Sequence, residues 1–341
     1  MNLKANVNTL TAKLGMKPTR KAALMVIAAL TLLFLIYANF MMNGYHLRLV
    51  NLVGINIILV VSLSITNGYT GIFSLGHAGF MAVGAYTTAL LAYPLERKAA
   101  LFRDMPQWLQ QIELPYIAAL LIGGLLAVIC SVLIGISVFK LRGHYLAVAT
   151  LGFMVIVNVL ASNLTDYTRG KSGISGLPAV TNLWWVYAIA GITIYVVWRL
   201  LNSAYGRAML AIREDDLAAE AMGIQIVKHK ILSFAMGAFF AAVGGSLYGH
   251  LIMSINPNMF SYTMTFGLVL MLVIGGSGTI AGAVLGAVLI TLVPELLLNK
   301  LERGVEIFGL QLPAMYGASQ VILSLALILV IILRPKGLLG K

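Results

Sequence analysis

The fold of this chain is decided by residues 231–294, which read ILSFAMGAFFAAVGGSLYGHLIMSINPNMFSYTMTFGLVLMLVIGGSGTIAGAVLGAVLITLVP and contain no Asp, Glu, Lys or Arg. A helix that crosses a bilayer needs about 20 apolar residues, at a rise of about 1.5 Å per residue. An uncharged run of this length therefore crosses a membrane more than once. It is interrupted at Asn256-Pro257-Asn258 and at Gly275-Gly276-Ser277-Gly278, which are turn-forming sequences. The run thus predicts three helices.

The whole chain has the composition of a membrane protein. Of its 341 residues, 60% are hydrophobic and 10% are charged, and its mean hydropathy is +0.95. A soluble domain normally carries about 25% charged residues, so this chain could not cover itself with a polar surface. Six further windows lack Asp, Glu, Lys and Arg, and they lie between residues 21 and 48, 48 and 96, 113 and 140, 142 and 166, 171 and 199, and 306 and 334.

The uncharged windows, divided where turn-forming sequences interrupt them, have the lengths of membrane-spanning helices. They predict an all-α integral membrane protein. The polytopic bundle has about ten transmembrane helices, near residues 22–42, 49–66, 71–93, 114–138, 144–163, 182–198, 231–253, 260–275, 279–298 and 314–333. The eighth is short enough to be a re-entrant segment instead. Basic residues precede the first, but its apolar run is longer than that of a signal peptide and no cleavage site follows. We interpret it as a retained helix.

The distribution of basic residues orients the bundle. Ten spans place both termini on one side of the membrane, and with that side cytoplasmic its segments hold about two thirds of the 23 Lys and Arg residues. The chain then comprises a basic cytoplasmic segment (1–21), a transmembrane domain (22–333) and a cytoplasmic tail (334–341). This topology and the attraction of anionic lipid explain the net charge of +12. We therefore expect the lipid bilayer, and no nucleic acid, as a partner.

The longest predicted cytoplasmic loop, near residues 202–230, contains a candidate surface helix. Either Asp215 or Asp216 can cap its start, and residues 217–222 favour helix formation. Gly223 can end it in the left-handed conformation. A helix of about two turns is marginal by itself, so it packs either on its own bundle or in a groove of a cytoplasmic partner. The pattern alone leaves both alternatives open.

This loop resembles the E-A-A-x-x-x-G loop through which permeases of ABC importers dock on their ATPase subunits. Ala218, Ala219 and Gly223 match that motif, whereas Leu217 stands where the motif has Glu, so the role of that acid does not carry over. The docking segment that the resemblance implies consists of Asp216, Leu217, Ala218, Ala219, Glu220 and Gly223.

Five further segments resemble, in order, the LivM type of branched-chain amino acid permease. They read NGYTGIFSLGHAGFMAVGAY (67–86), LRGHYLA (141–147), SGISGLP (172–178), GGSGTIAG (275–282) and LRPKGL (333–338). The resemblance covers roughly residues 45–340. It implies an ABC importer permease architecture and ATP-driven import of leucine, isoleucine or valine. It also implies that the chain is a multi-pass subunit in the bacterial cytoplasmic (inner) membrane.

The same resemblance implies the partners. These are a second homologous permease subunit, two cytoplasmic ATP-binding cassette subunits and an external, periplasmic amino-acid binding protein. ATP and Mg would be bound by the partner subunits, so no cofactor and no enzymatic activity are expected here. The sequence has no G-x-x-x-x-G-K-[ST] phosphate loop. Its single cysteine, Cys130, supports neither a disulfide nor a cysteine-based metal site, and we expect no metal.

Two glycine-rich breaks are the candidate translocation pathway, because broken helices expose backbone amides and carbonyls where they line a cavity. The candidate residues are Ser74, Gly76, His77 and Gly79 in the first break, and Gly275, Gly276, Ser277 and Gly278 in the second. The alternative is that these glycines serve helix packing. His77, likewise, is either a gate or pH sensor or a hydrogen-bonded packing histidine.

Three other functions are considered. A permease of the same architecture can carry urea, an amide or a sugar, and uptake competition among leucine, urea and ribose would discriminate. A secondary transporter usually has ionisable residues inside its spans, and here the spans are almost empty of them. A membrane enzyme would need an H-E-x-x-H motif, paired carboxylates or a Ser/His/Asp cluster, and the sequence offers none at membrane depth.

Overall fold

The computed structural model describes residues 18–102, 105–139, 145–295, 306–307, 310–311, 318–334 and 337–340. It divides into two units, residues 1–50 and 51–341, and each is described by itself. The first unit contains α2 (Pro18–Met41) and the start of α3 (Gly44–Leu63). Leu30, Leu33 and Phe40 of α2 are each more than half exposed. A run of exposed apolar side chains of this kind is typical of a surface that faces lipid or another protein.

A helix lies at each of the ten positions expected from the sequence. After α2 and α3 these are α4 (His77–Ala92), α7 (Tyr116–Val138), α8 (Tyr145–Asn163), α10 (Leu183–Leu201), α13 (Ile226–Ile252), α14 (Tyr262–Gly275), α15 (Ile280–Val293) and α17 (Ala318–Leu333). Five helical segments of the described chain are long and apolar enough to cross a membrane: Gly44–Tyr69, Tyr116–Val138, Tyr145–Asn163, Leu183–Leu201 and Ile226–Ile252. The all-α membrane architecture is confirmed, and ten crossings stay a prediction.

The third predicted span is shorter than expected at its start. α3 continues as a π-helix, η1 (Ser64–Tyr69), and α4 begins only at His77 instead of near residue 71. Between them Gly71 has a φ of 71°. The amide group of Asn67 clamps this non-helical segment, because its Nδ2 donates to the carbonyl oxygen of Ser74 and its Oδ1 accepts from the Ser74 amide, both at 3.2 Å.

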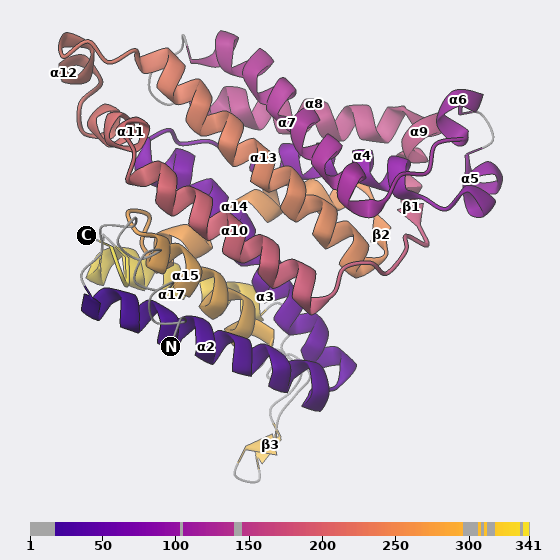
Figure 1. Ribbon diagram of the computed structural model, residues 1–341, viewed down its shortest axis with the longest axis horizontal. Helices are drawn as coiled ribbons and strands as arrows, with labels where there is room; N and C mark the ends of the chain where they lie inside the picture. Colours follow the sequence, from indigo (N-terminus) through magenta and orange to yellow (C-terminus); the bar gives the residue numbers. More distant parts are fainter. Residues whose placement is uncertain are drawn as a thin grey trace, which may run out of the picture. The chain divides into compact units, whose positions relative to one another are not determined.

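In the second unit α13 packs closely against α4 and α7 (Figure 1). Glycines allow this approach. A Cβ at Gly84 of α4 would lie 2.5 Å from the Cα of Ala242, and one at Gly245 of α13 would lie 2.6 Å from the Cα of Met81. Lipid gives no hydrophobic driving force between helices, so such close contact between small residues supplies much of the attraction in a membrane.

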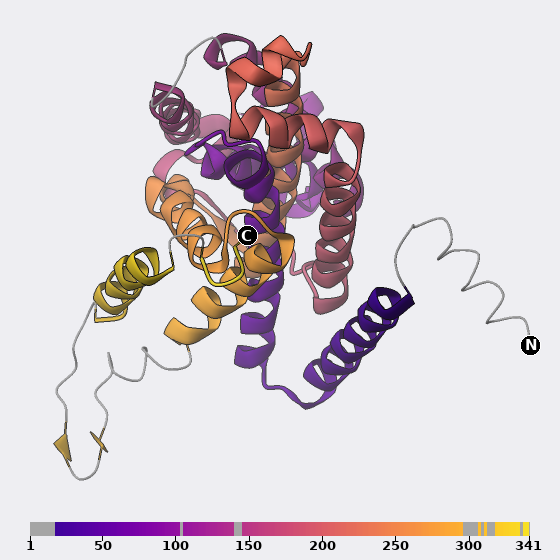
Figure 2. The same cartoon turned by 90° about the vertical axis from the view of Figure 1, so that its left-hand side faces the viewer.

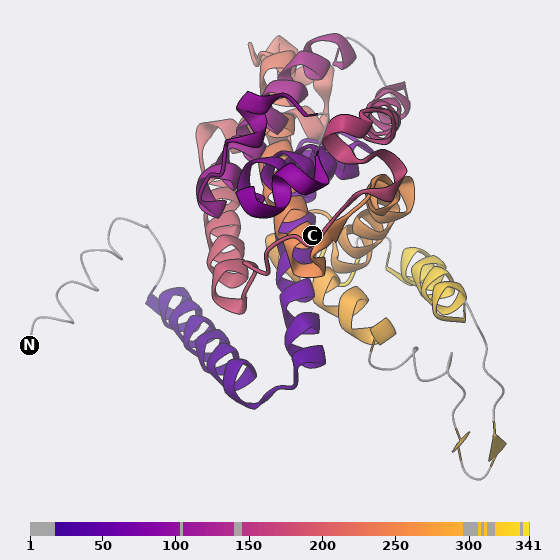
Figure 3. The same cartoon turned by 90° about the vertical axis from the view of Figure 1, so that its right-hand side faces the viewer.

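Short elements connect the helices at the two ends of this unit. One end carries α11 (Ala204–Glu214) and α12 (Asp216–Ala221), and the opposite end carries α5 (Leu95–Leu101) and α6 (Gln107–Gln110) (Figures 2 and 3). The remaining elements are α9 (Thr165–Thr168), η2 (Gly170–Ser172), η3 (Pro257–Phe260), the antiparallel pair β1 (Ile174–Ser175) and β2 (Ser254–Ile255), and the antiparallel pair β3 (Glu306–Ile307) and β4 (Leu310–Gln311).

The end with α5 and α6 contains a fully buried lysine. Lys98 donates from Nζ to the carbonyl oxygen of Ile112 at 2.8 Å. Burial lowers the pKa of Lys98, and the negative charge of Glu113 opposes that shift. Glu113 also accepts a hydrogen bond from the Leu95 amide at 3.0 Å. These contacts tie α5 to the chain that leads into α7, and they explain the buried charge without a ligand.

We predict that Gly84→Ala destabilises the second unit by about 1–3 kcal/mol, the usual cost of overpacking a well-packed core. The added methyl group would collide with the backbone of Ala242. The matched control is Gly191→Ala in α10, where an added Cβ meets no atom within 4 Å. Thermal unfolding of the purified protein in detergent measures both. Equal midpoints for the two variants would contradict the packing role of Gly84.

Candidate functional site

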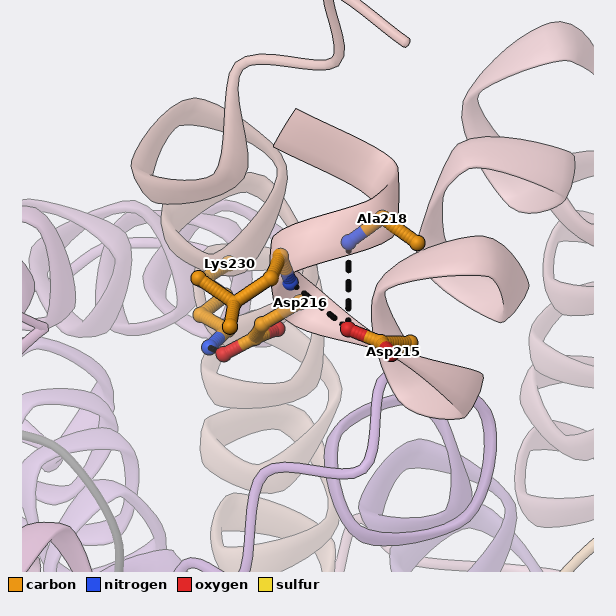
Figure 4. A network of polar contacts seen from close by, with 5 residues as sticks. Asp215, Asp216, Ala218 and Lys230 are labelled. Atoms are coloured by element: carbon orange, nitrogen blue, oxygen red, sulfur yellow. Dashed lines mark hydrogen bonds and ion pairs between the residues drawn. The ribbon is translucent and has the colours of Figure 1, made fainter. Parts of the chain in front are cut away.

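The short surface helix expected in the loop at residues 202–230 is α12. The carboxylate of Asp215 caps it, accepting hydrogen bonds from the amides of Leu217 at 2.8 Å and Ala218 at 3.1 Å (Figure 4). Of the two candidate caps, the structure therefore selects Asp215. Asp216 lies in the first turn, and its Oδ2 forms an ion pair of 2.6 Å with Nζ of Lys230 in α13. This pair holds the start of α12 against α13.

Gly223 ends the helix in the way that the sequence predicts. Its φ is 82°, in the left-handed region, and its amide donates to the carbonyl oxygen of Glu220 at 2.9 Å. The amide of Ile224 donates to the carbonyl oxygen of Ala219 at 3.1 Å. Such bonds satisfy carbonyls that the end of a helix leaves without partners. Residues on both sides of α12 thus fix its length.

α12 exposes apolar side chains beside charged ones. Ala219 is its one buried residue, whereas Leu217 is 67% exposed and Met222, directly after the helix, is 83% exposed. Beside it lies a hollow of about 560 Å³, lined by Glu220, Gln225, Ile226, Val227, Lys228 and Ile231. Exposed apolar side chains next to a hollow with charged residues suit a protein-docking surface.

The sequence analysis missed the longer helix α11, which precedes α12. Ser203 caps α11, because its Oγ accepts a hydrogen bond of 3.3 Å from the Gly206 amide. Met209 and Ile212 are buried. The pattern in the sequence that could have predicted α11 is a serine cap followed by apolar residues at helical spacing. α11 and α12 together form a compact pair of surface helices at this end.

Most of the first glycine break is buried, although Gly71 and Phe73 at its start are exposed. Ser74, Gly76, His77 and Gly79 are all buried. The Nε2 of His77 lies 3.0 Å from Oγ of Ser62, within hydrogen-bond distance. A Cβ at Gly76 would lie 2.8 Å from the carbonyl oxygen of Thr150, and one at Gly79 would lie 3.1 Å from the Cα of Met154. Close packing against α8 accounts for both glycines here.

The second glycine break joins α14 to α15 and also holds the end of the chain. Gly275 ends α14, and Gly276 has a φ of 115°. The Leu339 amide donates to the carbonyl oxygen of Gly275 at 3.0 Å, and Thr279 Oγ1 donates to the carbonyl oxygen of Leu339 at 2.9 Å. No local pattern in the sequence indicates that residues 337–340 bind this break.

The two breaks lie against each other although they are far apart in sequence. A Cβ at Gly68 would overlap the carbonyl oxygen of Ser277. Arg213, at the end of α11, donates from Nη1 to the carbonyl oxygen of Gly68 at 3.0 Å. The surface helices and both breaks therefore meet in one place, which the sequence did not predict.

Metal-binding side chains do not cluster in the described part of the chain. It contains no group of three or more His, Cys, Asp or Glu side chains that could hold a metal ion. Cys130 is a free, partly buried cysteine in α7. The features that stand out are an exposed surface helix and two broken helices.

A bundle of apolar helices with an exposed surface helix at one end defines a membrane permease class. The chain belongs to the family of branched-chain amino acid transport system permease components, whose model matches residues 45–333. It is therefore a transport subunit and not an enzyme, and it is a multi-pass protein of the cytoplasmic membrane.

Several characterised permeases are similar to this chain. The high-affinity branched-chain amino acid transport system permease protein LivM of Escherichia coli K12 is 29% identical, over 88% of this chain and 71% of the relative. LivM of Salmonella typhimurium is 28% identical over the same shares. The autoinducer 2 import system permease LsrC of Yersinia pseudotuberculosis is 29% identical over 44% of this chain and 46% of the relative. No solved structure matches the chain.

Proposed function

We propose that this chain is the membrane-spanning permease subunit of an ATP-driven ABC importer for leucine, isoleucine and valine. The observation that carries this proposal is the match of residues 45–333 to the branched-chain amino acid permease family, together with the similarity to two LivM proteins. The partners are a second homologous permease, two cytoplasmic ATP-binding subunits and an external amino-acid binding protein. ATP and Mg bind to the partners, and this chain holds no cofactor.

α12 is the proposed docking site for an ATP-binding subunit. Asp216, Leu217, Ala218, Ala219, Glu220 and Gly223 form it, and two observations support it. The capped ends at Asp215 and Gly223 make α12 a fixed shape, and its exposed apolar side chains have no cover in the described chain. A groove on an ATP-binding subunit that covers Leu217 and Met222 would remove this surface from water.

The bundle is proposed to cross the membrane about ten times, with residues 1–21, the loop at 202–230 and the tail at 334–341 in the cytoplasm. The uneven distribution of basic residues supports this orientation. It places α12 inside the cell and α6 outside, in agreement with their position at opposite ends of the second unit (Figure 1).

We predict that a cysteine introduced at Ala218 reacts with a thiol reagent only when the cytoplasmic side is accessible. A cysteine at the exposed Gln107 of α6 is the control and reacts in intact cells with an impermeant reagent. Both variants carry Cys130→Ser, since Cys130 is the chain's one native cysteine. Labelling at position 218 from outside intact cells would contradict the topology and the docking role of α12.

We predict that Gly223→Pro inserts into the membrane but fails to copurify with the ATP-binding subunits. Proline cannot adopt the left-handed backbone of Gly223 and has no amide for the bond to Glu220. Gly223→Asn is the matched control, because asparagine tolerates this conformation. Asp215→Ala, which removes a helix cap worth about 1 kcal/mol, should weaken copurification less. Undiminished copurification of Gly223→Pro would exclude α12 as the docking site.

The two glycine breaks are proposed to line the pathway near its cytoplasmic end. Gly71 and Phe73 are exposed, and Ser277 and Gly278 are partly exposed. The candidate residues Ser74, Gly76, His77, Gly79, Gly275 and Gly276 lie behind this surface, where they shape the backbone rather than offer side chains to the cargo. Broken helices with accessible backbone suit the passage of a zwitterion.

A different cargo is the second candidate function, since similarity to autoinducer 2 permeases covers 44% of this chain. We predict that excess unlabelled leucine, isoleucine or valine abolishes uptake of radiolabelled leucine by the complete transporter in proteoliposomes, while urea and ribose leave it unchanged. Uptake should require ATP and resist an uncoupler. If only ribose or urea competes with the labelled leucine, the amino-acid cargo is contradicted. If uptake proceeds without ATP and an uncoupler abolishes it, the ABC mechanism is contradicted.

A further inference from the structure

Arg213 lies where the surface helices meet the two glycine breaks. It is the penultimate residue of α11 and stands two positions before Asp215, the cap of α12. Its side chain is 35% exposed and the residue as a whole is exposed, so it lies at the protein surface. Its Nη1 donates to the carbonyl oxygen of Gly68, in η1. One residue separates Arg213 from the cap of α12, so a movement of α12 also moves the backbone of Arg213.

The same side chain lies beside both breaks. A Cβ at Gly71 would lie 3.0 Å from Cγ of Arg213 and 3.3 Å from its Cα. A Cβ at Gly278 would lie 3.6 Å from its Nη1, and Arg213 is the one residue that it would meet within 4 Å. Gly68 packs in turn against the carbonyl oxygen of Ser277. The guanidinium thus bonds to the end of η1 and lies beside the turn between α14 and α15, which approaches η1 directly at Ser277.

The contact with Gly68 is stronger than the ion pair that Arg213 also makes. The last carbonyls of a helix lack intrahelical partners, and a cation near them is favourable. The distance from Nε of Arg213 to Glu214 is 3.5 Å and the Glu214 side chain is 75% exposed, so that pair contributes little. The planar guanidinium has a fixed donor geometry, and the Gly68 carbonyl therefore sets where it lies.

We propose that Arg213 is a positioning residue that transmits the movement of α12 to the two glycine breaks. This inference rests on the proposed function, in which α12 receives an ATP-binding subunit. Arg213 contacts neither ATP nor cargo. When α12 shifts, the guanidinium moves with α11 and displaces the Gly68 carbonyl, and the close approach of Gly68 to Ser277 carries this displacement to the turn between α14 and α15. Without it, docking and ATP hydrolysis persist, but the movement does not reach the breaks.

The test uses the complete transporter in proteoliposomes, with the partner permease, both ATP-binding subunits and the external protein loaded with leucine. It compares Arg213→Gln with Arg199→Gln, an exposed arginine near the end of α10. The readout is the number of ATP molecules hydrolysed per leucine imported. We expect a ratio about tenfold higher for Arg213→Gln, the order of effect of one lost charge-assisted hydrogen bond. Arg199→Gln should match the wild type.

Two further variants separate coupling from a merely structural role. Arg213→Lys keeps a cationic donor and should restore most of the coupling. Gly278→Asp places a carboxylate beside Nη1 of Arg213 and should draw the guanidinium away from Gly68, raising the ratio of ATP to leucine as Arg213→Gln does. The double variant Arg213→Gln with Gly278→Asp should be no worse than either single variant, because both remove the same contact.

Each outcome of these measurements either supports the role of Arg213 or overturns it. A raised ratio with normal copurification of the ATP-binding subunits supports the inference. A wild-type ratio in Arg213→Gln or in Gly278→Asp overturns it, and so does loss of the ATP-binding subunits from Arg213→Gln, which would make Arg213 part of the docking or folding of α12. Failure of the wild-type complex to import leucine, or retention of the ATP-binding subunits by Gly223→Pro, overturns the proposed function instead.

Discussion

The structure depends on one constraint, which is that a backbone amide or carbonyl inside a bilayer must find its hydrogen-bond partner within the protein. Helices meet this constraint locally, and the described part of the chain is therefore largely helical. The constraint bears hardest where a helix is broken. At the first break the Asn67 side chain bonds both backbone groups of Ser74. At the second, residues of the chain's end bond the carbonyls of Ile274 and Gly275.

Glycine has two distinct uses in this bundle. In the middle of α4 and α13, Gly84 and Gly245 permit backbone contact between helices, which replaces the hydrophobic driving force that lipid does not supply. At Gly71, Gly223 and Gly276 the backbone has positive φ, and glycine adopts this conformation at little steric cost. The first use makes the bundle compact, and the second forms the turns that the proposed mechanism needs.

The end that carries α11 and α12 combines a rigid surface element with contacts to the broken helices. The Asp215 cap and the ion pair between Asp216 and Lys230 fix α12. Arg213 then connects that element to Gly68. A permease that houses no energy source needs such a mechanical connection, because work done on its surface must reach the pathway. The fold supplies one with few intervening residues.

The sequence by itself determined the membrane class, the ten helix positions and the end of α12 at Gly223, because hydropathy, turn residues and caps act over a few neighbouring residues. It left the choice between Asp215 and Asp216 open, missed α11 and started α4 too early. Only the tertiary structure decided that Gly68 lies against Ser277, that residues 337–340 bind the second break and that Arg213 bonds to Gly68. These contacts join residues far apart along the chain, and local patterns carry no information about which distant segments become neighbours.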